Sequence, residues 1–443
     1  MKPSVTLVRR LTPFSVALFG LAYICPTVVF STFGVLARAT QGATASAYLI
    51  ATIAILFTAV SYGRMAARWP QAGSAYTYVS HTANAATGFI TGWLLILDYL
   101  LVPMVICLFT AKAFEVVLPN ISYRLWVALI ALTTSVINVL GIQVANRINL
   151  TIMASQFAVI AALIILCVIF LRSPHDVDAA WTVAPFFNSQ TALPTVMSGA
   201  AIAAYSFLGF DAVTTLSEET INPTRSIPRA TVFAAAASGV IYIVCAFLLG
   251  LVHPSLVFHD VDNAGYEILA SVSGRGFLPM FTVILCAYIA SVMCAQAGSS
   301  RLLYAMGRDG TLPRRMLTYL QPRFRTPALN IGLIGVVMLA GEWLDVEAAA
   351  ACVNFGAFSA FMAVNLCVIF DHFGGKRQLP GGVLKLLQAT VGAVTAFWLI
   401  VSLHRTALTI GLMWLVAGVV YLFLRTGGFR NPMPKYTFDG DVQ

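Results

Sequence analysis

Residues 20–34 read GLAYICPTVVFSTFG, an apolar stretch with Pro26 near its middle and a glycine at each end. A proline inside a helix removes one backbone hydrogen bond and clashes with the preceding turn. The apolar run around it covers residues 14–37, and about 20 apolar residues suffice to cross the hydrocarbon core of a bilayer. We therefore predict a membrane-spanning helix that is broken near its centre.

A second interrupted stretch, residues 203–220, reads AAYSFLGFDAVTTLSEET and places Gly209 and Asp211 near the middle of another apolar run. Taken alone, Pro26 also fits an ordinary kink, and Gly209 fits close helix packing. The two stretches lie five spans apart, however, and secondary transporters often build their site from two discontinuous helices in corresponding repeats. We expect two five-helix repeats whose broken helices offer free N–H and C=O groups to a zwitterion or an ammonium group.

The composition also points to a membrane. Of the 443 residues, 59% are hydrophobic and only 10% are charged, whereas soluble domains carry about 25% charged residues. The high apolar fraction and the sparse cysteine exclude disordered chains and disulfide scaffolds. The net charge of +9 does not indicate a nucleic-acid partner, because the basic residues recur between apolar runs instead of forming one patch. The sequence predicts a polytopic protein embedded in a lipid bilayer.

The predicted fold class is an all-α membrane protein with twelve transmembrane helices, because a backbone in lipid must satisfy its own hydrogen bonds. If the N-terminus is cytoplasmic, most of the 26 Lys and Arg residues fall in loops on that side, as the positive-inside rule requires. This orientation places both termini in the cytoplasm. The apolar runs are residues 14–37, 48–63, 88–118, 125–141, 150–171, 195–216, 231–252, 277–300, 328–344, 348–370, 383–403 and 406–424.

Two acidic residues, Asp98 and Asp211, fall well inside these runs. An intramembrane charge costs a few kcal/mol or more, so function is its default explanation. Asp98 is suited to binding an ammonium group or carrying a proton, or else to pairing with a loop arginine. Asp211 is the stronger candidate for the same roles, and its alternative is to cap the second half of the broken helix.

Other acidic residues and the cysteines suggest different roles. Glu218 and Glu219 end the sixth run near Arg225 and Arg229, which favours a gate salt bridge or a loop anchor. The eight cysteines are scattered singly and suggest packing residues, so no metal or other cofactor is predicted. HExxH and intramembrane Ser/His pairs are lacking in the sequence, which argues against an enzyme. A filter-like loop is lacking as well, which argues against a channel.

Several long motifs resemble those of the amino acid–polyamine–organocation permeases, and in particular the bacterial putrescine importers of that superfamily. The resemblance extends along nearly the whole chain. The motifs are GLAY before Pro26, FSTFG after it, SYGRMAARWPQAGSAYTY at 61–78, GWLLILDYLLVPM at 92–104, GFDAV followed by SEETINPTRSIPRA at 217–230, SRLLYAMGRDG at 300–310, RTPALN and NFGAF.

The resemblance implies a LeuT-like fold of two inverted five-helix repeats plus two further helices. The repeats would occupy residues 14–171 and 195–370, and the added helices residues 383–424. The protein would lie in a bacterial inner membrane, with residues 1–13 and 425–443 as tails in the cytoplasm. Members of the superfamily move amines or amino acids by alternating access, often coupled to protons.

The resemblance also implies site residues. Tyr205 falls where relatives place an aromatic gate, and Asp211 falls where related amine exchangers have a carboxylate. The first broken helix would line the site along residues 22–27 and 31–33. The predicted substrate-binding residues are Ala22, Tyr23, Pro26, Thr27, Ser31, Asp98, Tyr205, Phe207, Gly209 and Asp211, and the predicted gate or coupling residues are Gln156, Glu218, Glu219 and Gln296.

Three positions depart from the family pattern. Ser31 stands where the putrescine importers have Asp, and Gln296 stands where their eighth helix has His. Gln156 aligns with a lysine that replaces a sodium ion in some proton-coupled relatives, and glutamine does not titrate. The loss of a carboxylate at Ser31 favours a substrate less cationic than putrescine.

The sequence therefore predicts a secondary transporter that imports a small amine or amino acid, with a putrescine-like amine as first candidate and protons as the coupling ion. An exchanger for a less cationic substrate and a sensor that binds without transporting are the alternatives. No obligate protein partner is indicated.

Overall fold

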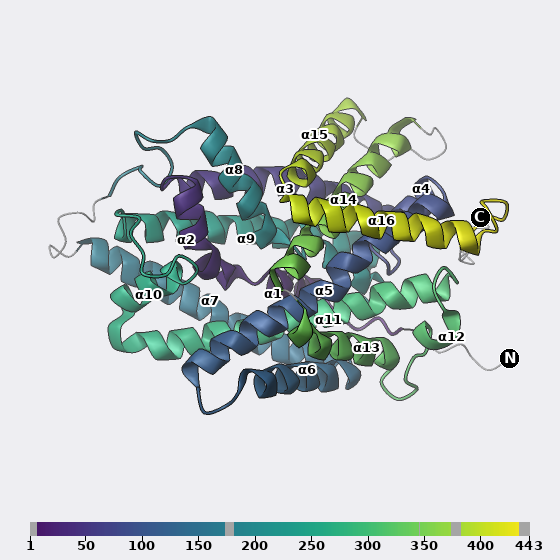
Figure 1. Cartoon of the computed structure of the whole chain (residues 1–443), viewed down its shortest axis with the longest axis horizontal. Helices are drawn as coiled ribbons and strands as arrows, with labels where there is room; N and C mark the ends of the chain where they lie inside the picture. Colours follow the sequence, from purple (N-terminus) through teal and green to yellow (C-terminus); the bar gives the residue numbers. More distant parts are fainter. Residues whose placement is uncertain (1–6, 173–180, 345, 374–381, 434–443) are drawn as a thin grey trace.

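The computed structural model describes residues 7–172, 181–344, 346–373 and 382–433 (Figure 1). Within these residues, ten helices are long and apolar enough to cross a membrane, and two shorter apolar helices cover 123–139 and 328–343. The predicted all-α membrane fold is confirmed at this level. Each of the twelve predicted runs coincides with one of these segments, although the number of segments that actually cross stays a prediction.

The helices are unequal in length because several spans are interrupted. Three short helices, α4, α10 and α12, were not predicted, since none is an apolar run. The predicted second run was too short, because α3 continues through Arg64 to Arg68, whose guanidinium pairs with buried Asp371. The α-helices are α1 (Pro13–Ile24), α2 (Val29–Ala39), α3 (Thr44–Arg68), α4 (Ala75–Thr82), α5 (Ala85–Val117), α6 (Tyr123–Val139), α7 (Ile142–Arg172), α8 (Leu193–Ala204), α9 (Pro223–Val252), α10 (Ala264–Ser273), α11 (Phe277–Arg308), α12 (Arg314–Leu317), α13 (Ala328–Ala340), α14 (Val346–Phe373), α15 (Gly382–Val401) and α16 (Arg405–Arg425).

The first span is broken where the sequence predicted. The helix α1 ends at Ile24, and Cys25 takes a left-handed conformation with φ of 56°. One 3-10 turn, η1 (Pro26–Val28), then leads into α2. Pro26 has no N–H to continue the α-helical ladder, so the chain changes direction at this point.

The sixth span is broken in a similar way. The helix α8 ends at Ala204 and is followed by a 3-10 turn, η2 (Tyr205–Phe207). Gly209 has φ of +104°, and a second 3-10 segment, η3 (Asp211–Glu219), completes the span. Glycine adopts this backbone conformation without the steric cost that a side chain would bring.

Packing brings the two breaks together inside the bundle. The helix α1 packs against α9, and α3 packs against both α8 and α9. Tyr23 of the first broken span lies directly against Gly209 of the second. Figure 1 shows α15 and α16 on the outside of the bundle, where α16 packs on α5 and α14.

Both termini of the described chain lie at the same end of the bundle. Leu7 packs against Tyr304 and Leu320, and Arg425, at the end of α16, donates to the carbonyl of Gly310. The helices α4 and α12 lie at this end as well, whereas α10 lies at the other (Figure 1). We call the first of these the N-terminal end of the bundle.

Candidate substrate site at the broken helices

Asp211 lies at the start of η3, at the break of the sixth span, and is 1% exposed. The phenolic oxygen of Tyr99 in α5 donates to its Oδ2 atom at 2.9 Å. A carboxylate in the first turn of a helical segment is also stabilised by the N-terminal dipole. The position is compatible with both predicted roles, contact with a substrate amine and support of the second half-helix, and the role in substrate binding stays a prediction.

Asp98 is buried in α5 directly before Tyr99, whose hydroxyl donates to Asp211. Among the residues that the structure describes, none forms a side-chain hydrogen bond or ion pair with Asp98. The predicted alternative, pairing with a loop arginine, is therefore not observed there. Lys112 of the same helix pairs with Glu115 instead, at 2.8 Å. A buried carboxyl without a protein partner is costly and calls for a functional explanation.

Side-chain hydroxyls hold several backbone carbonyls of the two breaks. Tyr242 of α9 donates to the carbonyl of Ser206 at 2.8 Å and also lies 3.4 Å from the carbonyl of Ile24. Ser291 of α11 donates to the carbonyl of Tyr23 at 2.6 Å. One tyrosine thus joins both unwound segments, which fixes their relative position.

Gln156 of α7 reaches the first break. Its Nε2 atom donates to Oγ1 of Thr27 at 3.0 Å and approaches the sulfur of Cys25 at 3.6 Å. All three side chains are buried. The structure thus brings two predicted residues, Gln156 and Thr27, into direct contact beside the unwound turn.

The remaining residues of the first break are only partly available to a ligand. Ala22, Tyr23 and Pro26 are buried. Ser31 is half-buried, and its hydroxyl donates to the carbonyl of Val28 at 2.9 Å within its own helix. The hydroxyl of Ser31 is therefore engaged within its own helix, and it carries no charge.

Two predicted aromatic residues take different roles. Tyr205 is half-buried and stacks on Phe358 of α14, with ring centroids 5.6 Å apart. Phe207 is fully buried and packs edge-on against Tyr242 at 5.2 Å. Tyr205 therefore keeps an exposed part that suits a gate, whereas Phe207 belongs to the packed core.

Gln296 lies outside the cluster. Ser291 and Gly298, seven residues apart on α11, both face Tyr23, so Gln296 falls on the opposite side of that helix. It donates to Oγ of Ser135 at 2.7 Å and accepts from Asn138 of α6 at 2.9 Å. The side chain of Gln296 therefore links α11 to α6. We do not include Gln296 in the proposed substrate site, and its predicted gate or coupling role stays untested.

The two glutamates that end η3 form ion pairs at the N-terminal end of the bundle. Glu219 makes a bidentate contact with Arg301 of α11, one arm of which, from Nη2 to Oε1, measures 3.0 Å. Glu218 pairs with Arg308 of the same helix at 2.8 Å. The sequence placed Arg225 and Arg229 near these glutamates, but the ion pairs are formed by Arg301 and Arg308 of α11, although α9 also packs against η3.

The backbone at this end is closed by hydrogen bonds as well. The amides of Arg10 and Leu11 donate to the carbonyl of Glu219 at 2.8 and 2.9 Å, and the amide of Ile221 donates to the carbonyl of Leu11 at 2.9 Å. The segment before α1 is thus held to the end of η3. We call this contact together with the Glu219–Arg301 pair the N-terminal gate.

Comparison with known proteins identifies the family. The family model described as "Amino acid permease" matches residues 15–374. The chain belongs to the amino acid permease family. Escherichia coli K12 has a low-affinity putrescine importer that is 37% identical over 440 residues, covering 98% of this chain and 97% of the relative. A branched-chain amino acid permease of Bacillus subtilis is 28% identical, covering 95% and 93%, and a methylthioribose transporter of the same organism is 25% identical, covering 95% and 94%.

Membership in the amino acid permease family confirms two predictions from the sequence. The resemblance to the amino acid–polyamine–organocation superfamily is correct. The chain is a multi-pass membrane transporter and not an enzyme.

The permease also uses residues that the sequence did not single out. Tyr99, Tyr242 and Ser291 hold Asp211 or the unwound carbonyls. Two further buried tyrosines lie close by: Tyr62 packs edge-on against Tyr78 at 6.1 Å and against Phe210, the neighbour of Asp211, at 5.6 Å. Aromatic and small polar residues are common in these apolar helices, so the sequence did not distinguish these five from the rest. Only Tyr99 could have been singled out, because it follows Asp98.

Gly209→Ala tests the close contact at the second break. A Cβ atom at this position would lie 1.9 Å from Cδ1 of Tyr23, and alanine at φ of +104° is strained as well. Backbone strain of this kind costs about 1–3 kcal/mol. We expect a lower thermal unfolding midpoint and a loss of uptake of about tenfold or more. Gly274→Ala is the control, because it also has positive φ but meets nothing within 4 Å; equal effects of both variants would contradict the contact.

Proposed function

We propose that this permease imports a small organic amine or an amino acid across the bacterial inner membrane by alternating access. One observation carries the proposal. Two buried carboxyls, Asp98 and Asp211, lie beside the paired helix breaks, and no described residue neutralises Asp98. An ammonium group is the ligand that such a pair of carboxyls favours, since buried charges require partners.

A putrescine-like amine is the first candidate substrate. The putrescine importer of E. coli is 37% identical to this chain along nearly its whole length. Ser31 removes the carboxylate that the resemblance led us to expect, but Asp98 supplies a second buried one directly before Tyr99, which donates to Asp211. Two carboxyls are matched to two ammonium groups, and this match supports a diamine despite Ser31.

A less cationic substrate, taken up by exchange, is the second candidate. The hydroxyl of Ser31 bonds to its own helix and adds no charge to the site. The branched-chain permease and the methylthioribose transporter of B. subtilis are named for substrates other than diamines. If one carboxyl is protonated during binding, the remaining charge suits a monoamine or the amino group of an amino acid.

We further propose twelve spans in a LeuT-like arrangement, with repeats at residues 14–171 and 195–370, added helices at 383–424 and both termini in the cytoplasm. The helices α1 and α8 begin the first and sixth spans, and α3 and α9 are the second and seventh spans. The packing of α1 on α9 therefore corresponds to the packing of α8 on α3, and this correspondence supports the two repeats. The short helix α4 follows the second span and α10 follows the seventh, and they lie at opposite ends of the bundle (Figure 1). The N-terminal gate would then be the cytoplasmic gate.

Protons are the coupling ion that we propose, carried by Asp98 or Asp211. A lysine-based route is not available at Gln156, which is bonded to Thr27. We expect uptake into proteoliposomes to rise when the lumen is more alkaline than the outside, and to fall severalfold when a protonophore collapses the gradient. Uptake that is indifferent to the gradient would exclude proton coupling.

The test of the substrate uses the purified protein in proteoliposomes with labelled putrescine, cadaverine, leucine and arginine. We expect saturable putrescine uptake that an excess of unlabelled cadaverine inhibits. Counterflow without net uptake would instead identify an exchanger. Saturable binding without uptake or counterflow would identify a sensor, and neither binding nor uptake of any amine or amino acid would exclude the proposal.

A further inference from the structure

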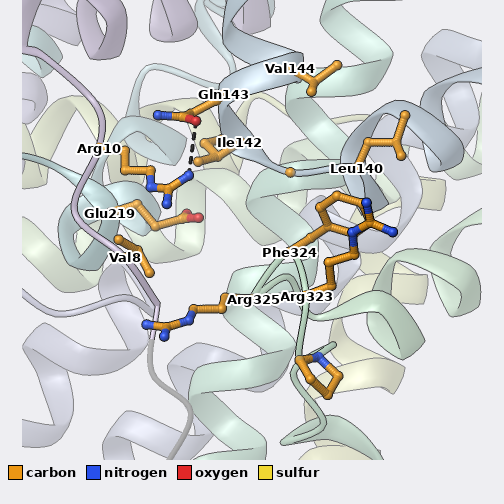
Figure 2. Close-up of a pocket in the computed structure, with 12 residues that line it drawn as sticks. Val8, Arg10, Leu140, Ile142, Gln143, Val144, Glu219, Arg323, Phe324 and Arg325 are labelled. Carbon is orange, nitrogen blue, oxygen red and sulfur yellow. Dashed lines mark hydrogen bonds between the residues drawn. The ribbon is translucent and has the colours of Figure 1, made fainter.

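A polar cavity of about 540 Å³ lies at the N-terminal end of the bundle. Its walls come from the segment before α1, the turn between α6 and α7, and the loop before α13. Figure 2 shows Arg10 from the first segment together with Arg323 and Arg325 from the third. The proposed transport site, at the centre of the bundle, does not use any of these three side chains.

The charge in this cavity is strongly positive. Arg10 donates to Oε1 of Gln143 at 3.0 Å, a neutral partner, and within the described part of the chain no carboxylate forms an ion pair with it. No described carboxylate forms an ion pair with Arg323 or Arg325, and Arg323 lies over the ring of Phe324. The carboxylate that lines the cavity belongs to Glu219, and Arg301 already neutralises it. Three guanidinium groups in one cavity attract an anion and repel a cationic transport substrate.

The backbone adds to this preference. The helix α7, 31 residues long, begins at Ile142 in the wall of the cavity, after Gly141 with φ of +116°. The amides of Val144 and Ala145 already donate to the carbonyl of Gly141, so the amides of Ile142 and Gln143 are the ones that α7 can offer to a ligand, together with the partial positive charge of the helix end. Phosphate groups combine well with such N–H groups and with the planar fork of arginine.

The cavity lies at the level where the apolar spans end. The helix α6 ends at Val139 and α13 begins at Ala328, on either side of the cavity. Leu140 and Val144, which line it, are 41% and 36% exposed. An apolar edge beside a cluster of arginines is suited to a lipid headgroup with its acyl chains alongside, although a soluble phosphate ester offers the same anionic group.

We propose that this cavity binds a phosphate group, carried by an anionic lipid or by a soluble phosphate ester, and that binding stabilises the closed N-terminal gate. The amide of Arg10 is part of that gate through the carbonyl of Glu219. A phosphate that contacts Arg10 and the Arg323–Arg325 loop therefore ties the segment before α1 to the loop before α13. Opening the gate would break these contacts.

The test measures binding in detergent-solubilised full-length protein and needs no transport assay, so it is independent of the proposed substrate. The probes are dioctanoyl phosphatidylglycerol, dioctanoyl phosphatidylcholine as the zwitterionic control, and pyrophosphate at constant ionic strength. We expect a saturable rise of about 2–4 °C in the unfolding midpoint with at least one anionic probe. Tryptic cleavage after Arg9 should slow severalfold with the same probe, because the segment before α1 is then held in place.

The matched variants are R323Q/R325Q, within the cavity, and R314Q/R315Q, in the exposed α12 outside it. Both remove two positive charges, and only the first should lose the thermal shift and the protection from trypsin. The single variant R325Q gives the same comparison if the double variant does not fold. A response to phosphatidylglycerol alone supports a lipid ligand, and a response to pyrophosphate supports a soluble one. Equal shifts in both double variants, or no shift of the wild-type protein with any probe, would overturn the proposal.

Discussion

Replacing Asp211 by Asn is expected to raise the KM for amine uptake about 10- to 100-fold. The substitution keeps the size of the side chain and its capacity to accept from Tyr99, but it removes the charge. A hydrogen bond to a charged group contributes about 1.5–3 kcal/mol, and each 1.4 kcal/mol is a factor of ten in affinity. Initial rates of putrescine uptake into proteoliposomes, measured over a range of concentrations, give KM and the maximal rate separately.

Two further variants define what the Asp211 result means. Asp98→Asn should weaken uptake as well, and the double variant should differ from the sum of the two if both carboxyls act on one substrate. Asp262→Asn removes one charge from an exposed loop and should leave uptake unchanged. Unaltered KM and unaltered pH dependence in Asp211→Asn would show that the substrate site lies elsewhere.

The two helix breaks were predictable because each depends on a local property of the chain. Pro26 cannot continue the hydrogen-bond ladder, and Gly209 permits a backbone conformation that other residues resist. Both effects are visible in a single sequence. Their spacing across five spans suggested two repeats, each opened by a broken helix, and the family resemblance placed a central site between them. Tyr23 and Gly209 are in contact across the two breaks.

The partners of the charged residues were harder to predict because they depend on the packing of helices far apart in the chain. Glu219 pairs with Arg301, 82 residues away, and not with the nearby Arg225. Gln296 was placed in the site by resemblance alone, but the side of α11 that faces the breaks is set by how that helix packs. The position of a residue along an apolar run predicts its depth in the membrane, whereas the direction of its side chain depends on how the neighbouring helices pack.

Replacing Glu219 by Gln is expected to open the N-terminal gate and to lower the unfolding midpoint by about 3–5 °C. The substitution leaves the guanidinium of Arg301 buried beside a neutral amide, and an unpaired charge in such a place costs about 3–5 kcal/mol. Hydrogen exchange at the amides of Arg10, Leu11 and Ile221 should become faster, since these amides close the gate. Under the alternating access that we propose, uptake should fall as well, because each gate must close in turn.

A double-mutant cycle separates the ion pair from general disruption. R301M alone leaves Glu219 unpaired and should be as harmful as E219Q, whereas E219Q/R301M removes both charges and should recover most of the lost stability. E218Q is the graded comparison, because the Glu218–Arg308 pair is more exposed and should contribute less. If the double variant were less stable than either single variant, or if exchange at Arg10 and Ile221 did not change in E219Q, the Glu219–Arg301 pair would not be what holds this end closed. Recovered stability without recovered uptake would instead show that transport needs the charges themselves, beyond the closure they provide.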